Sequence, residues 1–369
     1  MKIAYDIRPF LRNETGVGVY LKNLLFSLAT IDIENRYLLF SSSFKERFKS
    51  ENLPPFNNYK FKDMRIPVKL LNYLWYKKFF PPIDLFFREK ADIVHSPNPL
   101  TIPAHGKKII TVHDLSFIDH PSLTTEESGK YFRKKIKRSL EKCDGIISIS
   151  QFTKNRIIDL FGDKLKDKIR VIYNGSDMKK TESIKPNLKI PDRFILFTGT
   201  LEPRKNLLLL IKAFSMLKKR DENIKLILAG SADERAVPVL KKISELKLED
   251  DVIITGYIKR EEIRYLYDSC TIFVFPSHYE GFGIPVLEAA SLKKPSVISD
   301  IPVFREIFEN YPVYFDKDSP EDLMQKITTL LSDPHLSEKV SERGEKIAKK
   351  YSWSRAAKET LAFYMEVMG

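Results

Sequence analysis

Pro276-Ser-His-Tyr-Glu-Gly-Phe-Gly-Ile-Pro-Val-Leu-Glu-Ala-Ala290 follows the short apolar run Ile272–Phe275 and has the pattern of a turn that opens a helix. Pro285 suits the start of that helix, because the first turn of a helix leaves its backbone N–H groups without intrahelical partners. Gly281 and Gly283 are therefore expected in the turn, where the missing Cβ lets a ligand approach the backbone. A strand, a glycine turn and a helix N-terminus together form a natural site for a diphosphate.

Two carboxylates flank this glycine turn. Glu280 comes directly before it, and Glu288 is expected in the first turn of the helix. The sequence predicts that both side chains face one ligand from opposite ends of the turn. Since carboxylates accept hydrogen bonds, the pair suits the hydroxyl groups of a ligand better than its phosphates.

A second motif, Phe197-Thr-Gly-Thr-Leu-Glu-Pro-Arg-Lys-Asn206, also has the pattern of a strand, a glycine turn and a helix, which begins at about Leu207. Arg204 and Lys205 are expected at the carboxyl edge of a sheet, where ligands of open α/β sheets bind. Together the two cations can neutralise a diphosphate without a metal ion. The alternative is that they merely begin a solvated helix, and the Glu280 turn in the same half of the chain argues against it.

The alternation of short β-branched or aromatic runs with longer helical patterns is typical of βα units and a parallel sheet. It stops at Ser176–Asp192, where lysines and prolines predict an interdomain linker. The fold class is therefore α/β, with two Rossmann-like domains, residues 1–177 and 178–350, and a last helix in 351–369. Strands are expected at Lys2–Asp6, Arg36–Phe40, Ile93–His95, Lys108–Val112, Gly145–Ile149, Ile169–Ile172, Phe194–Thr198, Lys225–Ala229, Val252–Thr255, Ile272–Phe275 and Ser296–Ser299.

The composition, with 43% hydrophobic and 30% charged residues in 369, is that of a soluble globular protein. Cys143 and Cys270 lie in no redox or zinc pattern, so both are expected to be buried core thiols. No stretch approaches the ~20 apolar residues of a membrane span, and no signal peptide is evident, so we expect a cytoplasmic protein. The net charge of +13 favours an anionic partner. A nucleic acid is not expected, because neither a recognition helix nor an aromatic stacking platform is evident.

The two glycine motifs resemble those of the retaining glycosyltransferases of family four, also called group 1, which have the GT-B fold. Glu280 and Glu288 have seven residues between them and stand in the EGFGxPxLEA context of that family, and residues 199–206 resemble its donor-phosphate motif. The resemblance is dense from Phe194 to Ser319. It implies two Rossmann-like domains that face each other across a cleft, and a C-terminal helix in residues 351–369 that crosses back to the first domain. It also implies sugar transfer from a nucleoside diphosphate sugar with retention of configuration and with neither a metal nor another cofactor.

This resemblance assigns roles in the C-terminal domain, which would bind the donor. Arg204 and Lys205 would bind the diphosphate. Glu288 would bind the ribose hydroxyls, and Glu280 would be the catalytic carboxylate at the transferred sugar. The backbone around Tyr257 would contact the base, although a packing aromatic at a strand end is an equally open interpretation of this tyrosine. The other donor-binding residues lie in the glycine turns: Gly199, Gly281, Phe282 and Gly283.

The N-terminal half, which would bind the acceptor, matches the same family in three places. Thr15–Tyr20 resembles the glycine loop after the first strand, in which Gly16 and Gly18 would approach the phosphates. The pair that begins at His113 resembles the family's His-Asp motif, whose histidine lies beside the transferred sugar. A capping or core histidine is the alternative there. His95 ends another strand on the same edge, and we interpret it as structural.

The start Asp6-Ile-Arg-Pro with Thr15-Gly-Val-Gly is most similar to bacterial mannosyltransferases of surface-polysaccharide assembly. This similarity favours mannose transfer from GDP-mannose to a glycan or lipid-linked acceptor, such as a lipopolysaccharide intermediate. UDP- or dTDP-sugars stay open as donors, because base recognition in such folds often runs through main-chain atoms. A non-catalytic sugar-nucleotide-binding protein is a further alternative.

Asp316-Lys-Asp318 spells the pattern with which metal-dependent glycosyltransferases hold a divalent cation. Because Ser-Pro-Glu-Asp follows, capping of a helix N-terminus is the favoured interpretation. No metal site is therefore predicted.

Val68–Phe80 and Lys130–Arg138 combine lysines with aromatic residues. A basic helix beside aromatic side chains can lie on anionic lipid, so we expect contact with the inner face of the plasma membrane. Tyr73 and Trp75 are the aromatic residues expected to strengthen this contact. An ordinary solvated helix face is the alternative.

Overall fold

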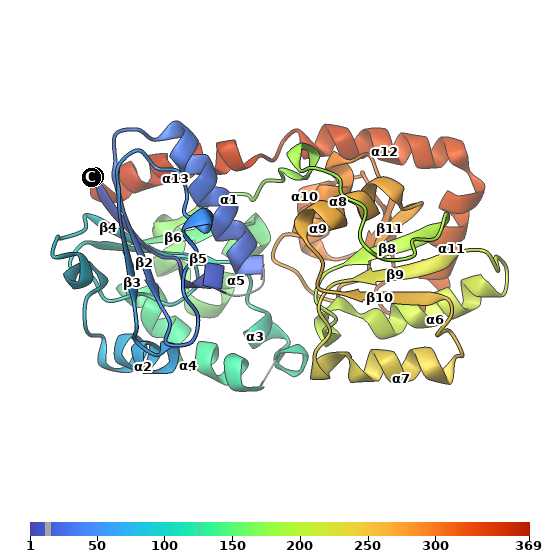
Figure 1. Ribbon diagram of the computed structural model, residues 1–369, viewed down its shortest axis with the longest axis horizontal. Coiled ribbons are helices and arrows are strands. Elements are labelled where there is room, and N and C mark those ends of the chain that lie inside the picture. The colour runs from blue at the N-terminus through green and yellow to red at the C-terminus, as the bar shows by residue number, and fades with distance from the viewer. Residues whose placement is uncertain (12–15, 125) are drawn as a thin grey trace. The chain divides into compact units, whose positions relative to one another are not determined.

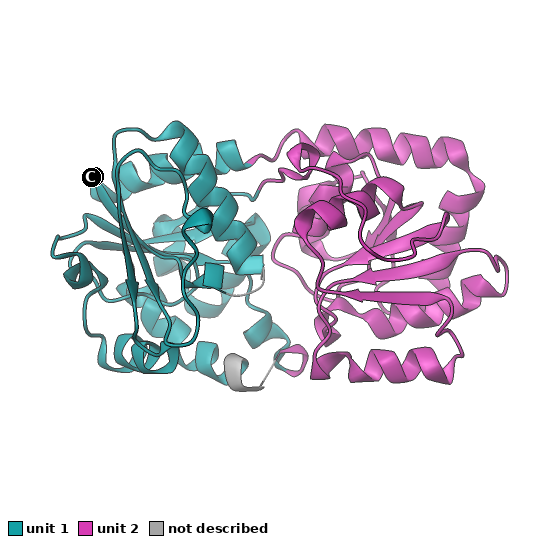
Figure 2. Ribbon diagram, in the orientation of Figure 1, with its two compact units in different colours: residues 1–121, 125–174, 353–369 teal, residues 122–124, 175–352 magenta. Residues whose placement is uncertain are grey.

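A computed structural model describes residues 1–11, 16–124 and 126–369 of the chain. It divides into two units, each with its own β-sheet, which Figure 2 shows in separate colours. The last helix belongs to the same unit as the first strand. Unit 1 comprises Met1–Pro121, Thr125–Asn174 and Trp353–Gly369, and unit 2 comprises Ser122–Thr124 and Gly175–Ser352.

Unit 1 is built on a seven-stranded parallel sheet with the order β3-β2-β1-β4-β5-β6-β7 (Figure 1). The strand order reverses between β1 and β4, where open α/β sheets bind their ligands. The strands are β1 (Lys2–Asp6), β2 (Arg36–Ser42), β3 (Tyr59–Met64), β4 (Ile93–Ser96), β5 (Lys107–Val112), β6 (Gly145–Ser148) and β7 (Ile169–Val171). The helices are α1 (Gly16–Ile31), α2 (Val68–Tyr73), the π-helical turn η3 (Leu74–Lys78), α3 (Ser116–Asp119), α4 (Glu126–Lys142), α5 (Gln151–Phe161) and α13 (Trp353–Met368).

Unit 2 is built on a six-stranded parallel sheet with the order β10-β9-β8-β11-β12-β13, which reverses between β8 and β11. Its strands are β8 (Phe194–Thr198), β9 (Lys225–Ala229), β10 (Val252–Gly256), β11 (Ile272–Phe275), β12 (Ser296–Ser299) and β13 (Val313–Phe315). Its helices are α6 (Leu207–Lys218), α7 (Val237–Glu245), α8 (Arg260–Ser269), α9 (Ile284–Ser291), α10 (Pro302–Phe308), α11 (Pro320–Ser332) and α12 (Pro334–Ala348). Two parallel-sheet α/β domains were predicted, and this prediction is confirmed.

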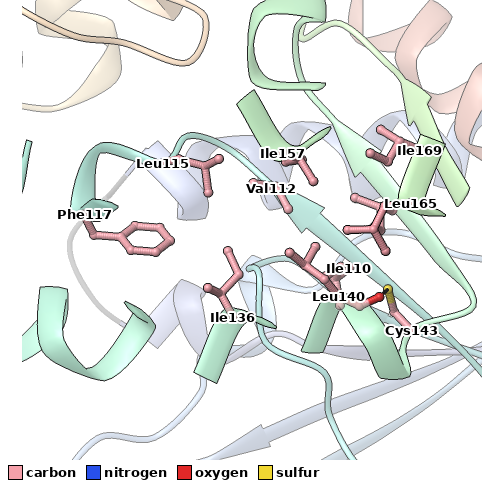
Figure 3. Close-up of a cluster of buried hydrophobic side chains, with 11 residues drawn as sticks. Ile110, Val112, Leu115, Phe117, Ile136, Leu140, Cys143, Ile157, Leu165 and Ile169 are labelled. Atoms are coloured by element: carbon pink, nitrogen blue, oxygen red, sulfur yellow. Dashed lines mark hydrogen bonds between the residues drawn. The ribbon is translucent and has the colours of Figure 1, made fainter. Parts of the chain in front are cut away.

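Apolar packing on both faces explains why the central strands are nearly continuous apolar runs. Along β1, Ala4 packs into a core with Trp75 of η3, whereas the next residue, Tyr5, contacts Tyr364 of α13. Successive side chains of a strand point to opposite faces, so one strand joins two cores. Figure 3 shows another core of unit 1, where Cys143 is buried among aliphatic side chains. Cys143 and Cys270 are both buried and free, as expected.

The eleven strands expected from the sequence are all present, with ends that differ by at most two residues. The strands β3 and β13 were not predicted. β3 lies at the edge of its sheet, and its residues Tyr59-Lys-Phe-Lys-Asp-Met64 are exposed or half-buried. The segment therefore has no apolar run from which a strand could be predicted. β13 is also an edge strand and has only three residues, Val313–Phe315.

The lysine- and proline-rich segment after β7 contains only a short 3₁₀ turn, Met178–Lys180. It is held on unit 2, because Arg264 of α8 donates a hydrogen bond to the Met178 carbonyl at 2.7 Å. At the other end of unit 2 the chain passes from α12 to α13, which packs against α1 in unit 1. There the rings of Tyr20 and Trp353 lie 6.0 Å apart.

Candidate active site

The two motifs of unit 2 occupy the loops that follow β8 and β11, the strands between which the strand order reverses. Arg204 and Lys205 lie in the 3₁₀ turn η8 (Pro203–Lys205) after β8, and Glu280 lies in the loop after β11. The backbone N–H of His278 donates a hydrogen bond to the Arg204 carbonyl at 2.9 Å, which ties the two loops together. Residues that are 75 positions apart in sequence are thus brought into contact at the edge of the sheet.

Glu280 is the centre of an ion cluster. Its Oε1 accepts a hydrogen bond from Lys205 Nζ at 2.6 Å, and its Oε2 lies 2.8 Å from Arg204 Nη1. The same Arg204 nitrogen also donates to the Tyr279 carbonyl at 3.0 Å. One carboxylate is therefore shared by two cations, in a geometry that fixes all three side chains.

Burial and charge act in opposite directions on this cluster. Glu280 is only 8% exposed. Its burial acts to raise the pKa, but the charges of Arg204 and Lys205 outweigh burial and lower the pKa to about 2. Burial lowers the pKa of Lys205, although Glu280 opposes that change. Lys205 is 8% exposed and its ammonium lies 4.8 Å from the centre of the Phe275 ring, so the interpretation of this segment as a solvated helix start is wrong.

A second acidic partner extends the cluster outward. Glu202 Oε1 accepts a hydrogen bond from Arg204 Nη2 at 2.8 Å, and Glu202 Oε2 accepts one from Arg235 Nη1 at 2.7 Å. Arg235 is paired in turn with Asp233 at 2.7 Å. Sequence reasoning missed both Glu202 and Arg235. Glu202 stands inside the motif, two residues before Arg204, whereas Arg235 belongs to the loop after β9 and carries no local signal.

Glu288 lies on α9, which begins at Ile284, so it stands in the second turn of the helix and not in the first as expected. It is 6% exposed. Arg260 Nη2 lies 3.1 Å from its Oε1, and the Tyr267 hydroxyl donates to its Oε2 at 3.2 Å. No motif in the sequence indicated these partners on α8. Glu280 and Glu288 therefore each have cationic neighbours of their own.

The glycines of the two turns have different roles. Gly283 is the N-cap of α9 with φ of 100°, and a Cβ there would lie 2.8 Å from the Phe304 ring, so only glycine fits. Gly199 also has a positive φ, 136°, directly after β8. Gly281 is buried between Glu280 and Phe282. The centre of the Phe282 ring lies 5.8 Å from that of Tyr351, so this side chain takes part in aromatic packing.

Tyr257, the residue expected near the base, follows Gly256 at the end of β10. Its side chain is 50% exposed, so it is not a core residue of the strand end. The loop that contains it leads directly to Arg260 at the start of α8. Tyr257 and the Glu288 cluster are thus connected by a short piece of chain.

Asp316 and Asp318 lie in the turn that leads into α11. The Asp318 N–H donates to Asp316 Oδ1 at 3.0 Å, and Ser319, the N-cap of α11, accepts from the Asp322 N–H at 3.1 Å. Their proposed structural role is confirmed. Within the residues that the structure describes, no group of three or more His, Cys, Asp and Glu side chains is placed to hold a metal ion.

In unit 1, His113 follows β5 and is fixed by its surroundings. Its Nε2 donates a hydrogen bond to the Pro97 carbonyl at 2.8 Å, and the centres of the Tyr20 and His113 rings lie 4.8 Å apart in a T-shaped arrangement. Burial lowers the pKa of His113. The neighbouring Asp114 accepts hydrogen bonds from the N–H and the hydroxyl of Ser116, so this acid orients α3.

A glycine loop was expected at Thr15–Tyr20, but the described residues of this segment, Gly16–Tyr20, are helical. Gly16 and Gly18 lie in the first turn of α1, which begins at Gly16. Thr15 falls outside the described residues. A glycine at a helix start is tolerated, because the first turn lacks intrahelical partners for its N–H groups.

His95 has the structural role that was expected. It is completely buried, and its Nδ1 and Nε2 lie 2.6 Å from the Tyr364 hydroxyl and 2.7 Å from Thr111 Oγ1. Burial lowers the pKa of His95 to about 3.

The fold and these motifs define a glycosyltransferase of the GT-B class. The family described as "Glycosyl transferases group 1" matches residues 178–347, and the one described as "Glycosyltransferase Family 4" matches residues 15–180. The chain belongs to this family of glycosyltransferases, as its motifs predicted.

Its relatives are named for sugar transfer. O-antigen chain mannosyltransferase B of Escherichia coli is 27% identical over 383 residues, which cover 99% of both chains. O-antigen chain mannosyltransferase RfbU of Salmonella typhimurium is 30% identical over 62% of both chains. Among solved structures, sucrose-phosphate synthase from Thermosynechococcus elongatus has a TM-score of 0.78 at 17% identity and covers 99% of this chain and 98% of its own. Anabaena HepE in complex with UDP and glucose has a TM-score of 0.74 at 17% identity over 98% of both chains. These likenesses establish the GT-B fold.

Proposed function

We propose that this glycosyltransferase moves mannose from GDP-mannose to a glycan or lipid-linked glycan acceptor, with retention of configuration and without a metal ion. The observation that carries the proposal is the buried cluster in which Arg204 and Lys205 share Glu280 at the strand edge of unit 2. The similarity of the chain to O-antigen mannosyltransferases supports mannose as the transferred sugar.

The chemistry follows from charge. As the bond between the sugar and the diphosphate breaks, negative charge grows on the leaving diphosphate. Arg204 and Lys205 stabilise that charge, and the N-terminus of α9 adds its dipole. Two fixed cations thus take the place of a divalent metal. The acceptor attacks from the face that the diphosphate leaves, and a donor phosphate oxygen takes the acceptor proton, so configuration is retained.

The two glutamates act on different parts of the donor in this proposal. Glu280 binds a hydroxyl of the transferred sugar while it holds Lys205 in place. Glu288 binds the ribose hydroxyls, and Arg260 and Tyr267 orient its carboxylate. GDP- and UDP-sugars carry the same ribose hydroxyls, so this contact does not select between guanine and uracil.

A UDP- or dTDP-sugar is the second candidate donor. The observation that favours it is the structural likeness to HepE, which was solved with UDP-glucose as well as with UDP. A protein that binds a sugar nucleotide without turnover would use the same residues of unit 2.

The proposal includes contact of unit 1 with anionic lipid through one surface, which we call the basic face. α4 contributes exposed Lys134, Lys137 and Arg138, and the stretch from α2 onward contributes Tyr73 and Phe80, which are 45% and 59% exposed. Such a combination of cations and aromatic rings suits a headgroup layer. Among the described residues, no helix is both long and apolar enough to span a bilayer.

Three residues expected on the basic face have other roles. Trp75 is completely buried beneath Arg8, whose guanidinium lies 4.8 Å from its ring, so it belongs to the core. Arg133 donates a hydrogen bond to the Phe117 carbonyl at 2.6 Å. The Lys135 ammonium lies 4.0 Å from the centre of the Tyr131 ring. The exposed cations listed above are therefore the ones to test.

The deciding experiment supplies the purified protein with GDP-mannose, UDP-glucose, UDP-N-acetylglucosamine and dTDP-rhamnose, each with extracted lipid-linked acceptors and excess EDTA. NMR of the product then gives the anomeric configuration of the new bond. Transfer of mannose from GDP-mannose with an unchanged anomeric configuration is the expected result. Transfer only from another donor, or an inverted product, would overturn the corresponding part of the proposal.

A further inference from the structure

The Asp6-Ile-Arg-Pro segment of unit 1 contains a buried ion pair that the donor site of unit 2 does not use. Arg8 Nε donates a hydrogen bond to Asp6 Oδ1 at 2.8 Å, and Arg8 Nη2 donates one to Asp6 Oδ2 at 2.7 Å. Only 9% of the Arg8 side chain and 4% of the Asp6 side chain are exposed. Burial acts to lower the pKa of Arg8, but the charge of Asp6 outweighs burial and raises this pKa. The guanidinium is therefore charged, and one carboxylate matches its charge.

The ion pair lies beside the point where the strand order of unit 1 reverses. Asp6 is the last residue of β1, and Arg8 begins the short 3₁₀ turn that follows. Open α/β sheets bind their ligands outside this edge. A buried ion pair is seldom more stable than apolar packing of the same volume, so stability alone does not explain its presence here.

Polar side chains from three other segments surround Arg8. Asn72 Oδ1 of α2 accepts a hydrogen bond from Arg8 Nη1 at 3.0 Å. One turn further along, burial raises the pKa of Tyr76 to about 12, while the charge of Arg8 and hydrogen bonds with Asn98 and Arg8 oppose the rise. The rings of Tyr76 and Tyr131 of α4 lie 6.0 Å apart in a T-shaped arrangement. Asn72, Tyr76 and Asn98 are half-buried, so the group is open on one side.

The hydroxyl of Tyr131 is the unsatisfied member of this group. It is buried and has no hydrogen-bond partner among the residues that the structure describes. Burial raises the pKa of Tyr131, so the hydroxyl keeps its proton at neutral pH. The Lys135 ammonium lies 4.0 Å from the centre of the Tyr131 ring and 5.6 Å from that of Tyr76, so this cation engages ring faces and not the hydroxyl. A buried hydroxyl without a partner costs free energy, which a ligand hydroxyl can recover.

We propose that the side chains around Arg8 bind one uncharged sugar ring of the acceptor. This group, which we call the Arg8 cluster, consists of Asp6, Arg8, Asn72, Tyr76, Asn98 and Tyr131. In it, the Tyr131 hydroxyl forms a hydrogen bond with a sugar hydroxyl. The role of that sugar as acceptor rests on the proposed function, whereas the binding of a sugar rests on the Arg8 cluster itself.

The charges of the Arg8 cluster favour a sugar over a phosphate. A guanidinium without a counter-ion attracts a phosphate, but Arg8 already has a bidentate carboxylate partner. A phosphate at Arg8 would lie close to the negative charge of Asp6 and would be repelled by it. Sugar hydroxyls both donate and accept hydrogen bonds, so they suit the phenol, the amides and those N–H groups of Arg8 that Asp6 and Asn72 do not use.

Binding of small probes to the whole chain tests the Arg8 cluster. Methyl α-mannoside is the uncharged probe and mannose 6-phosphate is the charged one, and excess GDP fills the donor site of unit 2. We expect saturation-transfer difference NMR to detect the mannoside on the wild-type protein and to give a higher Kd for the phosphate. No transfer to the mannoside, or tighter binding of the phosphate, would overturn the inference.

Tyr131→Phe removes the unsatisfied hydroxyl and keeps the ring. The matched control is Tyr59→Phe, which changes a tyrosine of β3 that is 43% exposed. We expect Tyr131→Phe to raise the Kd for methyl α-mannoside about five-fold, the scale of one neutral hydrogen bond, and Tyr59→Phe to leave it unchanged. In sugar transfer, the same variant should raise the KM for the acceptor by a similar factor. Equal Kd values for the two variants would overturn the contact.

Asp6→Asn tests the charge argument, because it leaves Arg8 without its counter-ion. This variant should bind mannose 6-phosphate roughly ten-fold more tightly than the wild-type protein does. An unchanged Kd for the phosphate in a folded variant would overturn the selection by charge, and if Asp6→Asn does not fold, the two wild-type Kd values decide the point. Wild-type protein that binds the mannoside through Tyr131 but transfers no sugar would instead overturn the proposed function and leave the sugar site standing.

Discussion

Replacing Glu280 with glutamine removes one negative charge from between two cations and keeps the size of the side chain. In the free protein, Lys205 then keeps its buried position but loses its closest counter-ion, while Arg204 retains Glu202 at 2.8 Å. Removal of one partner from a buried ion pair typically costs about 3–5 kcal/mol, because the other charge stays desolvated. Glu280→Gln should therefore destabilise unit 2.

The pKa of Glu280 gives a similar magnitude. A fall from the ordinary 4.5 to about 2 corresponds to ~3 kcal/mol at ~1.4 kcal/mol per pKa unit. Because the folded-state pKa is depressed, this stabilisation is fully present above pH 4.5 and is lost as the pH falls towards 2. A loss of ~3 kcal/mol should lower the Tm of a unit of this size by roughly 6–12 °C at neutral pH.

The same substitution should tighten the binding of GDP. In the wild-type protein the incoming diphosphate shares Arg204 and Lys205 with Glu280, and like charges ~10 Å apart repel by ~1.7 kcal/mol at an effective dielectric constant of ~20. Without that repulsion the Kd for GDP should fall by about ten-fold. Turnover should nonetheless drop by roughly ten- to hundred-fold, because Glu280 no longer offers a charged hydrogen bond to the transferred sugar.

Differential scanning calorimetry, isothermal titration with GDP and turnover of GDP-mannose measure the three effects. Glu309→Gln is the control, since Glu309 pairs with Lys350 on the surface with both side chains about half exposed, and should change stability by less than ~1 kcal/mol. The reasoning fails if Glu280→Gln binds GDP more weakly than wild type, or if its stability equals that of Glu309→Gln.

Three further outcomes follow from the proposed site and surface. Arg204→Ala and Lys205→Ala should each weaken GDP binding by ~1.5–3 kcal/mol in calorimetry, and unchanged affinity of a folded double variant would contradict their assignment. Turnover should survive excess EDTA, whereas loss of activity that magnesium or manganese restores would place a metal in the reaction. Exchange of Lys134, Lys137 and Arg138 for glutamine should weaken co-sedimentation with anionic vesicles by ~1 kcal/mol per charge and leave GDP affinity unchanged. Salt should weaken the wild-type contact through screening, and wild type that pellets equally with neutral vesicles would exclude the basic face as a lipid contact.

The fold was predictable because parallel strands leave a strong apolar signal. β1, β8, β9, β11 and β12 have the predicted bounds, since each is buried in its sheet and ends where a polar or glycine-rich loop begins. The edge strand β3 was not predictable in this way, because alternate lysines at positions 60 and 62 give an exposed edge no apolar run. Edge strands bury little surface, so their pairing depends on a neighbour that the local sequence does not show.

The candidate site was predictable only where its residues stand inside a motif. The sequence placed Arg204 and Glu280 in loops of one sheet, and the structure brings them within 2.8 Å of each other. It gave no signal for Arg235 or Arg260, because each reaches its carboxylate from a loop or helix far away in sequence. Trp75 was expected on the surface, because its neighbours in sequence are lysines and exposed aromatic residues, but it lies on the side of η3 that faces the core.

The free site is already neutralised from within, and this bears on how a donor is recognised. Arg204, Lys205 and Arg235 are matched by Glu280, Glu202 and Asp233 in one continuous chain of contacts. In the proposed function, a diphosphate adds negative charge to this balanced cluster, and its phosphates share Arg204 and Lys205 with Glu280. Sharing weakens the contacts of Glu280 with its cations, so this carboxylate can also accept a hydrogen bond from a sugar hydroxyl. In this arrangement, binding of the diphosphate prepares Glu280 to contact the transferred sugar. The binding free energy of the intact donor should therefore exceed the sum of the binding free energies of the nucleotide alone and the sugar alone.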